Sequence, residues 1–326
     1  MKRLLLFLIG LLATIVLLWQ ADLEIVLATL LLVKLDVLLL ACGLQVVTIL
    51  VIAWQWKRLA GIIKVRVGFL NVLHINMVGT FVESVTPAVK AGGEAVKAIM
   101  LKSKLGMTSG EAVAVVGVQK VVSIVPLMVL VAISLIQYLF NHGVMGLQGK
   151  VILASFAVVL VAVAFLVGAL YYPRWTKRVV NRFTPGKYKT KIAEMVDQFQ
   201  QSIQKIKSSR GELLFNLALS FFIWSFFPLK AYIVAIALGI DVGFWNLAAV
   251  IYLAYIVAMV PLTPGGLGTF EATVAFLLMP LSISFATAMA FAILIRFITY
   301  WFVFASSTLF VASAWMTKEL KTKCSF

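Results

Sequence analysis

Residues 86–95 read TPAVKAGGEA and residues 263–272 read TPGGLGTFEA, so one pattern occurs twice, 177 positions apart. Thr-Pro opens both copies, Glu-Ala closes both, and each copy lies within an apolar stretch. Proline removes a backbone donor and glycine weakens a helix, so each copy predicts a helix break. Irregular backbone at membrane depth is tolerated only where protein buries it or where it lines a water-filled cavity. Two such breaks in corresponding halves indicate the central site of a transporter.

The composition is typical of an integral membrane protein. The chain of 326 residues is 63% hydrophobic and 12% charged, with a mean hydropathy of +1.08. Soluble domains are only about half apolar and about a quarter charged. The apolar runs are long and do not alternate with polar residues, so the spans are predicted to be helices rather than the strands of a barrel.

The net charge of +16 comes from lysines and arginines gathered in a few short loops. This is the positive-inside pattern of membrane proteins, and the basic-aromatic runs that single-stranded nucleic acid requires are missing. We therefore expect no nucleic-acid partner. An even number of spans with these charges predicts a multi-pass protein of the plasma (inner) membrane with both termini in the cytoplasm.

Six full spans are predicted, and the apolar run after Met1 is interpreted as a retained span rather than a cleaved signal. They cover about 4–20, 36–56, 111–140, 150–172, 212–238 and 284–315. The broken elements are 67–105 and 247–281. The first is too polar for one span and lies between two basic loops, so a re-entrant hairpin is expected. Its counterpart enters from the other side of the membrane.

The same offset aligns the spans that flank the motif, and the two aligned triplets start on opposite sides of the membrane. This predicts an inverted-topology repeat, with repeat one at about 35–140 and repeat two at about 212–316. The predicted fold class is an all-α polytopic membrane protein with two re-entrant helical hairpins. It forms a single transmembrane domain over 1–326.

The segment 173–211 is the longest polar stretch and is strongly basic. Apolar residues recur in it at helical spacing, which predicts a cytoplasmic amphipathic helix. Two interpretations remain open. The helix either packs on the spans as a solvated cytoplasmic element or lies on an anionic lipid surface.

The motifs resemble those of the lysylphosphatidylglycerol synthase transmembrane (flippase-type) family. The resemblance rests on TPxxxGGEA followed by a basic loop, and on PxTPGGLGxxEA later in the chain, and it covers nearly the whole sequence. Larger members of that family fuse the membrane domain to a soluble aminoacyl transferase domain. The chain ends at Phe326 without one, so the resemblance implies a stand-alone, lipid-translocating protein and argues against synthase activity.

Charged side chains inside spans are costly and are functional candidates for that reason. Glu94 and Glu271 occupy the same position in the two copies. Each is expected in the first turn after a break, where a carboxylate complements the helix dipole. Each also has the chemistry to bond the opposite hairpin, a proton or a lipid amine.

Arg296 lies in the middle of the last span, and its planar fork suits phosphate. Its first-half counterpart is Gln119, with Lys120 adjacent. The alternative role of Arg296 is a structural ion pair with Glu271 or Glu94. Lys230, in another span, is expected to extend outward to the membrane surface.

The breaks themselves supply further candidates for the site. Lys90 has no charged counterpart, because Leu267 replaces it, and Glu83 is expected to pair with Lys90 or Lys120. The Thr-Pro steps are expected to shape the breaks, and the glycines free backbone N–H groups for a ligand such as phosphate. The residues concerned are Thr86, Thr263, Gly92, Gly93, Gly265 and Gly266.

The predicted function is translocation of an anionic phospholipid or a lipid-linked carrier through a polar site at the bilayer midplane. No P-loop, catalytic triad or metal cluster is present in the sequence, so we expect neither an enzyme nor a cofactor. The alternatives are a membrane enzyme acting on a lipid headgroup through Glu83 and Glu94, or a scaffold for a soluble lipid-modifying enzyme. A second copy of the chain, forming a homo-oligomer, is the remaining candidate partner.

Overall fold

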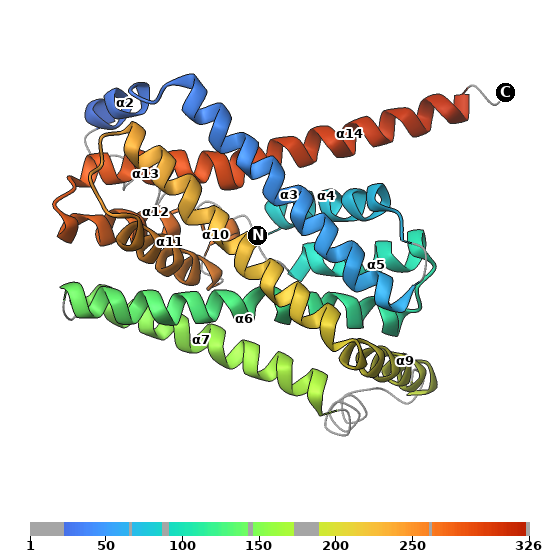
Figure 1. Ribbon diagram of the computed structural model, residues 1–326. Helices are drawn as coiled ribbons and strands as arrows, with labels where there is room; N and C mark the ends of the chain where they lie inside the picture. The colour runs from blue at the N-terminus through green and yellow to red at the C-terminus, as the bar shows by residue number, and fades with distance from the viewer. Residues whose placement is uncertain are drawn as a thin grey trace.

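The computed structural model describes residues 23–64, 67–86, 91–142, 146–172, 189–260 and 263–323. This part of the chain is helical and contains no strand (Figure 1). The protein is therefore an all-α polytopic membrane protein, as predicted. The predicted span 4–20, the basic stretch 173–188 and residues 87–90, which include Lys90, lie outside the described residues.

Five helices of the described chain are long and apolar enough to cross a membrane. They correspond to five of the six predicted spans. Their membrane segments are Leu35–Ile63, Ser109–Asn141, Gly149–Ala169, Arg210–Ala237 and Phe285–Ala314. They belong to helices α3 (Leu35–Ile63), α6 (Ser109–His142), α7 (Gly146–Tyr171), α10 (Arg210–Ala237) and the last span, which is built from α13 (Phe285–Arg296), a π-helical turn (Phe297–Trp301) and α14 (Phe302–Lys323).

Four shorter helices form the two broken elements. α4 (Phe69–Val85, 17 residues) packs on α5 (Ala91–Leu105, 15 residues), and α11 (Phe244–Met259) packs on α12 (Thr269–Leu278). A full crossing needs about 20 residues. None of the four helices reaches that length, so each pair forms the hairpin that its motif predicts.

The two halves run antiparallel and make equivalent contacts. α3 and α10 lie side by side (Figure 1): Arg58 contacts Glu212 at one end of the pair, and Gln45 contacts Lys230 toward the other. α4 packs on α14 as α11 packs on α6, and α5 packs on α6 as α12 packs on α13. The structure thus has the inverted repeat that the offset predicts.

Two further helices extend this correspondence beyond the predicted boundaries. α2 (Leu23–Leu31) precedes α3 and packs on α13, while α9 (Lys189–Ser208) precedes α10 and packs on α6. They lie at opposite ends of the structure in Figure 1. The repeat bounds predicted from the sequence, about 35–140 and about 212–316, included neither helix.

The apolar face of α9 is covered by protein. Ile203 and Ile206 are buried in a cluster with residues of α3 and α6, and Val196 is buried as well. Gly110 of α6 lies so close that a Cβ there would be 2.4 Å from the carbonyl oxygen of Met195. Of the two interpretations of this helix, the structure supports the one in which it packs on the spans.

The two hairpins differ in their surroundings. α11 is apolar and buried along nearly its whole length, since α6, α7, α10 and α12 all pack on it. An all-round apolar helix requires such enclosure. α4 carries fewer buried residues, and α3, α5, α14 and the short turn Pro264–Gly266 pack on it in the described part of the chain. The second break is therefore held more firmly than the first.

Candidate functional site

The second break is a glycine turn between α11 and α12. A short 3₁₀ turn spans Pro264–Gly266, and Gly265, Gly266 and Gly268 have φ values of 62°, 70° and 79°. Side chains with a Cβ rarely adopt this left-handed conformation, which explains the GGLG sequence. The Thr263 hydroxyl donates to the Leu267 carbonyl oxygen at 2.7 Å and closes the turn.

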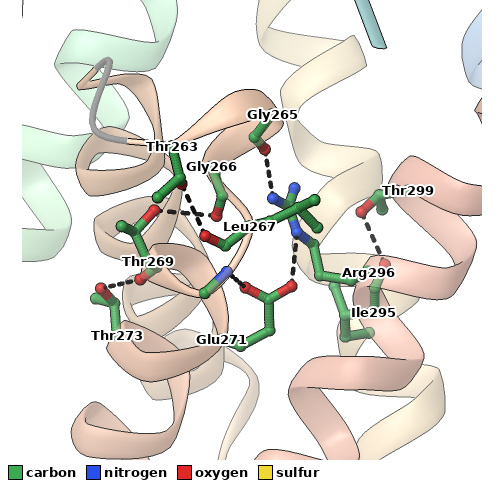
Figure 2. A network of polar contacts seen from close by, with 11 residues as sticks. Thr263, Gly265, Gly266, Leu267, Thr269, Glu271, Thr273, Ile295, Arg296 and Thr299 are labelled. Carbon is green, nitrogen blue, oxygen red and sulfur yellow. Dashed lines mark hydrogen bonds and ion pairs between the residues drawn. The ribbon is translucent and has the colours of Figure 1, made fainter. Parts of the chain in front are cut away.

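Glu271 joins this turn to the last span (Figure 2). Its Oε2 accepts a hydrogen bond from the Gly268 amide at 2.8 Å, and its Oε1 accepts one from Arg296 Nε at 3.1 Å. Nη2 of Arg296 also donates to the Gly265 carbonyl oxygen. Glu271 therefore caps α12 as predicted, and Arg296 pairs with it across the break.

The pair is almost completely buried, with side-chain exposures of 6% for Arg296 and 3% for Glu271. The guanidinium carbon lies over two aromatic rings, 4.9 Å from the Phe270 centroid and 5.1 Å from the Tyr300 centroid. Such stacking on an aromatic face is available to arginine and not equally to lysine. The structural ion pair raised as an alternative in the sequence analysis is thus present.

A π-helical turn follows Arg296 directly. In Phe297–Trp301 the hydrogen bonding widens, and the amide of Phe302 donates to the carbonyl oxygen of Phe297. Single π turns inside α-helices occur frequently at functional sites. Nothing in the local sequence indicates this turn, and it was not predicted.

Tyr300, which lies on this turn, links the two breaks. Its hydroxyl donates to the carbonyl oxygen of Ser84 at 3.1 Å, in the last turn of α4. Its ring lies against Gly265, where an added Cβ would be 2.5 Å from the ring. The turn Pro264–Gly266 also contacts α4 directly. The two breaks therefore meet inside the protein, as the repeated motif predicts.

The first break is closed differently. α4 ends with Thr86, whose hydroxyl and amide both donate to the carbonyl oxygen of Val82, at 2.7 and 3.0 Å. A Cβ at Gly92 would be 2.7 Å from Thr86 Oγ1, and one at Gly93 would be 2.5 Å from the Gly79 carbonyl oxygen. These two glycines permit close packing of α4 on α5, and neither has a positive φ.

Glu94 carries the ion pairs of the first break. Its Oε1 accepts hydrogen bonds from Lys120 at 3.0 Å and from Lys97 at 3.3 Å. Its Oε2 is buried and has no hydrogen-bond partner in the described part of the chain. The corresponding oxygen of Glu271 accepts the Gly268 amide and caps α12, so the two glutamates make different contacts.

Lys97 belongs to this site although it was not among the candidates predicted from the sequence. It is largely buried, and its Nζ lies 5.2 Å from the Trp56 ring centroid. Its position one turn after Glu94 is a signal that was available, since charges three residues apart on a helix face one another. A basic loop was expected there instead.

The predicted candidates thus form two carboxylate–cation groups, one beside each break. Arg296 pairs with Glu271, and Lys120 pairs with Glu94. Glu83 lies beside Gly93, where an added Cβ would be 2.9 Å from the glutamate Cβ. In the described segments, no group of three or more His, Cys, Asp or Glu side chains is arranged to hold a metal ion.

One prediction about an intramembrane charge is wrong. Lys230 was expected to extend to the membrane surface, but it has no exposed surface. α3 packs along α10 and covers it, so no path to the membrane surface is open to the side chain.

Comparison with known proteins identifies the family. The lysylphosphatidylglycerol synthase TM region matches residues 4–307. The chain belongs to this family. Its relatives include a UPF0104 membrane protein of Pyrococcus horikoshii, 25% identical over 317 residues that cover 92% of this chain and 94% of that one. A UPF0104 membrane protein of Methanothermobacter thermautotrophicus is 24% identical and covers 82% of each chain.

The family membership agrees with the resemblance inferred from the two motifs. The match includes both breaks, both ion-paired glutamates and the π turn, since all lie within residues 4–307. A third relative, a UPF0104 membrane protein of Methanocaldococcus jannaschii, is 24% identical over 272 residues. The chain is therefore a multi-pass membrane protein of the lysylphosphatidylglycerol synthase TM-region family.

Proposed function

We propose that this member of the lysylphosphatidylglycerol synthase TM-region family translocates an anionic phospholipid or a lipid-linked carrier across the plasma membrane. The observation that carries the proposal is the meeting of the two breaks at Tyr300, with a glutamate–cation group beside each. Polar groups of this kind are expensive at membrane depth and are retained for binding or transport.

The ion pairs leave donors that an anionic headgroup can use. Arginine has five N–H donors, and the bonds to Glu271 and Gly265 use two of those of Arg296. A phosphate that approached the break would be held by the remaining guanidinium donors while Glu271 kept the arginine in position. On the other side of Tyr300, Lys120 and Lys97 supply donors beside Glu94.

The proposed orientation follows the basic side chains. The end of the structure that holds α5 and α9 carries the lysines of those helices, and it would face the cytoplasm. α2 and the end of α10 at Ala237 would then face the outside. In this arrangement the first hairpin enters from the cytoplasm, and the second enters from the opposite side.

A pair of variants separates binding from folding. Arg296→Gln alone leaves Glu271 buried without a counter-charge, which destabilises by about 3–5 kcal/mol. Arg296→Gln/Glu271→Gln removes both charges and keeps hydrogen-bonding groups of similar shape. We expect the double variant to fold but to lose lipid translocation. The measurement is the loss of inner-leaflet fluorescence from acyl-labelled phosphatidylglycerol on addition of dithionite to proteoliposomes.

The matched control is Arg58→Gln/Glu212→Gln. This ion pair joins α3 to α10 at their ends, with N–O distance 2.5 Å, and is partly exposed. Its neutralisation removes the same two charges from a place outside the proposed site, so translocation should remain near the wild-type rate. A folded Arg296→Gln/Glu271→Gln protein that translocates as fast as the control would refute the proposed role of the pair.

A further inference from the structure

A lysine is enclosed between α3 and α10, away from the two breaks. Lys230 has no exposed surface, and its Nζ donates to Gln45 Oε1 and to Thr48 Oγ1, the latter at 3.4 Å. The Phe227 ring centroid lies 4.4 Å from Nζ. Among the described residues, no carboxylate forms an ion pair with this amine.

The surroundings of Lys230 suit an uncharged amine. An ammonium group has three donors and needs a counter-charge when buried, whereas a neutral amine has two N–H groups. Two acceptors face it, because the Thr48 hydroxyl spends its own proton on the Leu44 carbonyl oxygen at 2.7 Å. An isolated charge at this depth would carry a large desolvation penalty.

The titratable groups on neighbouring helices do not replace the missing carboxylate. They include Cys42 of α3, Tyr252 and Tyr255 of α11, and the ion-paired Lys120 of α6 and Arg296 of α13. The first three are neutral near pH 7 in their ordinary state. The other two are cations that glutamates already neutralise. The carboxylates of these helices are engaged elsewhere or exposed: Glu212 pairs with Arg58, Glu111 accepts the Thr108 amide, and Asp36 is exposed.

A proline interrupts the hydrogen bonding of α10 beside this lysine. Pro228 lies inside α10 and leaves the Trp224 carbonyl oxygen without its helical donor. The Tyr252 hydroxyl donates to that oxygen at 3.3 Å instead. From Lys230 the helix extends about 10 Å to Ala237 and about 30 Å to Arg210. A small separation of α3 and α10 at the Ala237 end would let water reach the amine.

We propose that Lys230 is a proton-binding site that couples translocation to a proton gradient. When α3 and α10 separate at this level, the amine takes one proton from water and becomes an ammonium. When that end closes and the contact opens toward the Arg210 end, the ammonium gives its proton to water on the opposite membrane face, and the two N–H groups return to Gln45 and Thr48. This inference rests on the proposed function, because the movement coupled to proton binding is lipid translocation.

The first experiment compares wild type, Lys230→Met and Lys34→Met in proteoliposomes that contain acyl-labelled phosphatidylglycerol. Lys34 is exposed and serves as the control. With a pH gradient imposed, the wild type and Lys34→Met should accumulate probe in one leaflet, up to about tenfold per pH unit for one proton per lipid. Lys230→Met should exchange lipid without responding to the gradient. An equal response in all three proteins, or in none while lipid moves, overturns the coupling.

The second experiment does not need transport, so it separates failure of the coupling from failure of the proposed function. Between about pH 6 and about pH 9 an unfolded chain keeps its lysines protonated. The closed fold holds Lys230 as the amine, so unfolding takes up a proton and the wild type should gain stability relative to Lys230→Met as pH rises. Thermal unfolding in one detergent should show a melting difference that grows by several degrees across this range.

A constant melting difference would overturn the proposal whether or not the lipid probe moves. Cys42→Ser is measured alongside, because the Cys42 thiol is a titratable group whose charge would interact with the Lys230 amine. The pH response should persist in Cys42→Ser and be lost in Lys230→Met. If Cys42→Ser abolishes the response instead, the thiol and not the amine exchanges the proton.

Discussion

At the scale of single residues, Tyr300 joins the two breaks, although nothing in its local sequence indicates such a role. Arg296 and the two glutamates could be predicted, because a charge within an apolar stretch is costly and must have a role. A tyrosine in a membrane helix is ordinary and gives no such signal. Its importance depends on the π turn and on a carbonyl group of α4, which is distant in sequence.

Replacing Tyr300 by phenylalanine should separate the hydrogen bond from the ring contact. The variant keeps the ring against Gly265 but leaves the Ser84 carbonyl oxygen unpaired, which costs about 1–3 kcal/mol. We expect a lower melting temperature and a changed translocation rate. Tyr232→Phe is the control, because that hydroxyl makes no hydrogen bond within the described residues; it should melt like the wild type. Equal melting of the two variants would contradict the bridging role.

Lys230 was noticed in the sequence, but its environment was predicted wrongly. The sequence shows a lysine in an apolar stretch, and a long side chain near a helix end ordinarily reaches the membrane surface. The prediction failed because α3 packs on α10 at that level, and helix pairing of this kind is not contained in the local sequence.

At the scale of elements, the two breaks have the same motif and different solutions. The second has three glycines in the left-handed region, while the first uses its glycines for close helix packing. The hairpins could be predicted from proline, glycine and the offset. The difference in geometry could not, because it depends on what packs around each hairpin.

Gly265→Ala should be more harmful than Gly239→Ala. Both positions have similar positive φ values, 62° and 67°, so alanine strains the backbone at each by about 1–2 kcal/mol. At Gly239 nothing lies within 4 Å of the added Cβ, whereas at Gly265 the Tyr300 ring lies 2.5 Å away. Thermal unfolding of both variants should show the larger loss for Gly265→Ala.

Adding Tyr300→Ala to each glycine variant tests the cause of that difference. Removal of the ring should relieve part of the loss in Gly265→Ala and none of it in Gly239→Ala. If the ring removal is simply additive with both alanine substitutions, the contact between the turn and Tyr300 has no energetic role.

At the scale of the whole molecule, the repeat includes α2 and α9 as equivalent elements at opposite ends. The offset alone did not reveal this. α9 is basic and amphipathic, while α2 is nearly all apolar, so the two sequences do not look alike. Their equivalence is visible only in how they pack, α2 on α13 and α9 on α6.

The inverted arrangement predicts opposite accessibility for these helices. Single cysteines are placed at Ala28 and at Gln204, both exposed, in a background of Cys42→Ser and Cys324→Ser. A membrane-impermeant maleimide added to intact cells should label Ala28→Cys directly, and should label Gln204→Cys only after the membrane is permeabilised. Labelling of both cysteines from outside would contradict the inverted topology.

Within the described residues, one buried carboxylate oxygen of Glu94 accepts no hydrogen bond, and this makes the two halves unequal. A transporter with two identical halves spends equal time open to either side. In the described residues, both carboxylate oxygens of Glu271 accept hydrogen bonds and α11 is enclosed, whereas Glu94 accepts hydrogen bonds at one carboxylate oxygen only. Unequal fastening makes the two open states unequal in free energy. Of the two open states in the proposed translocation cycle, the one in which the first hairpin has moved should be the more populated, and we expect a lipid to enter there first.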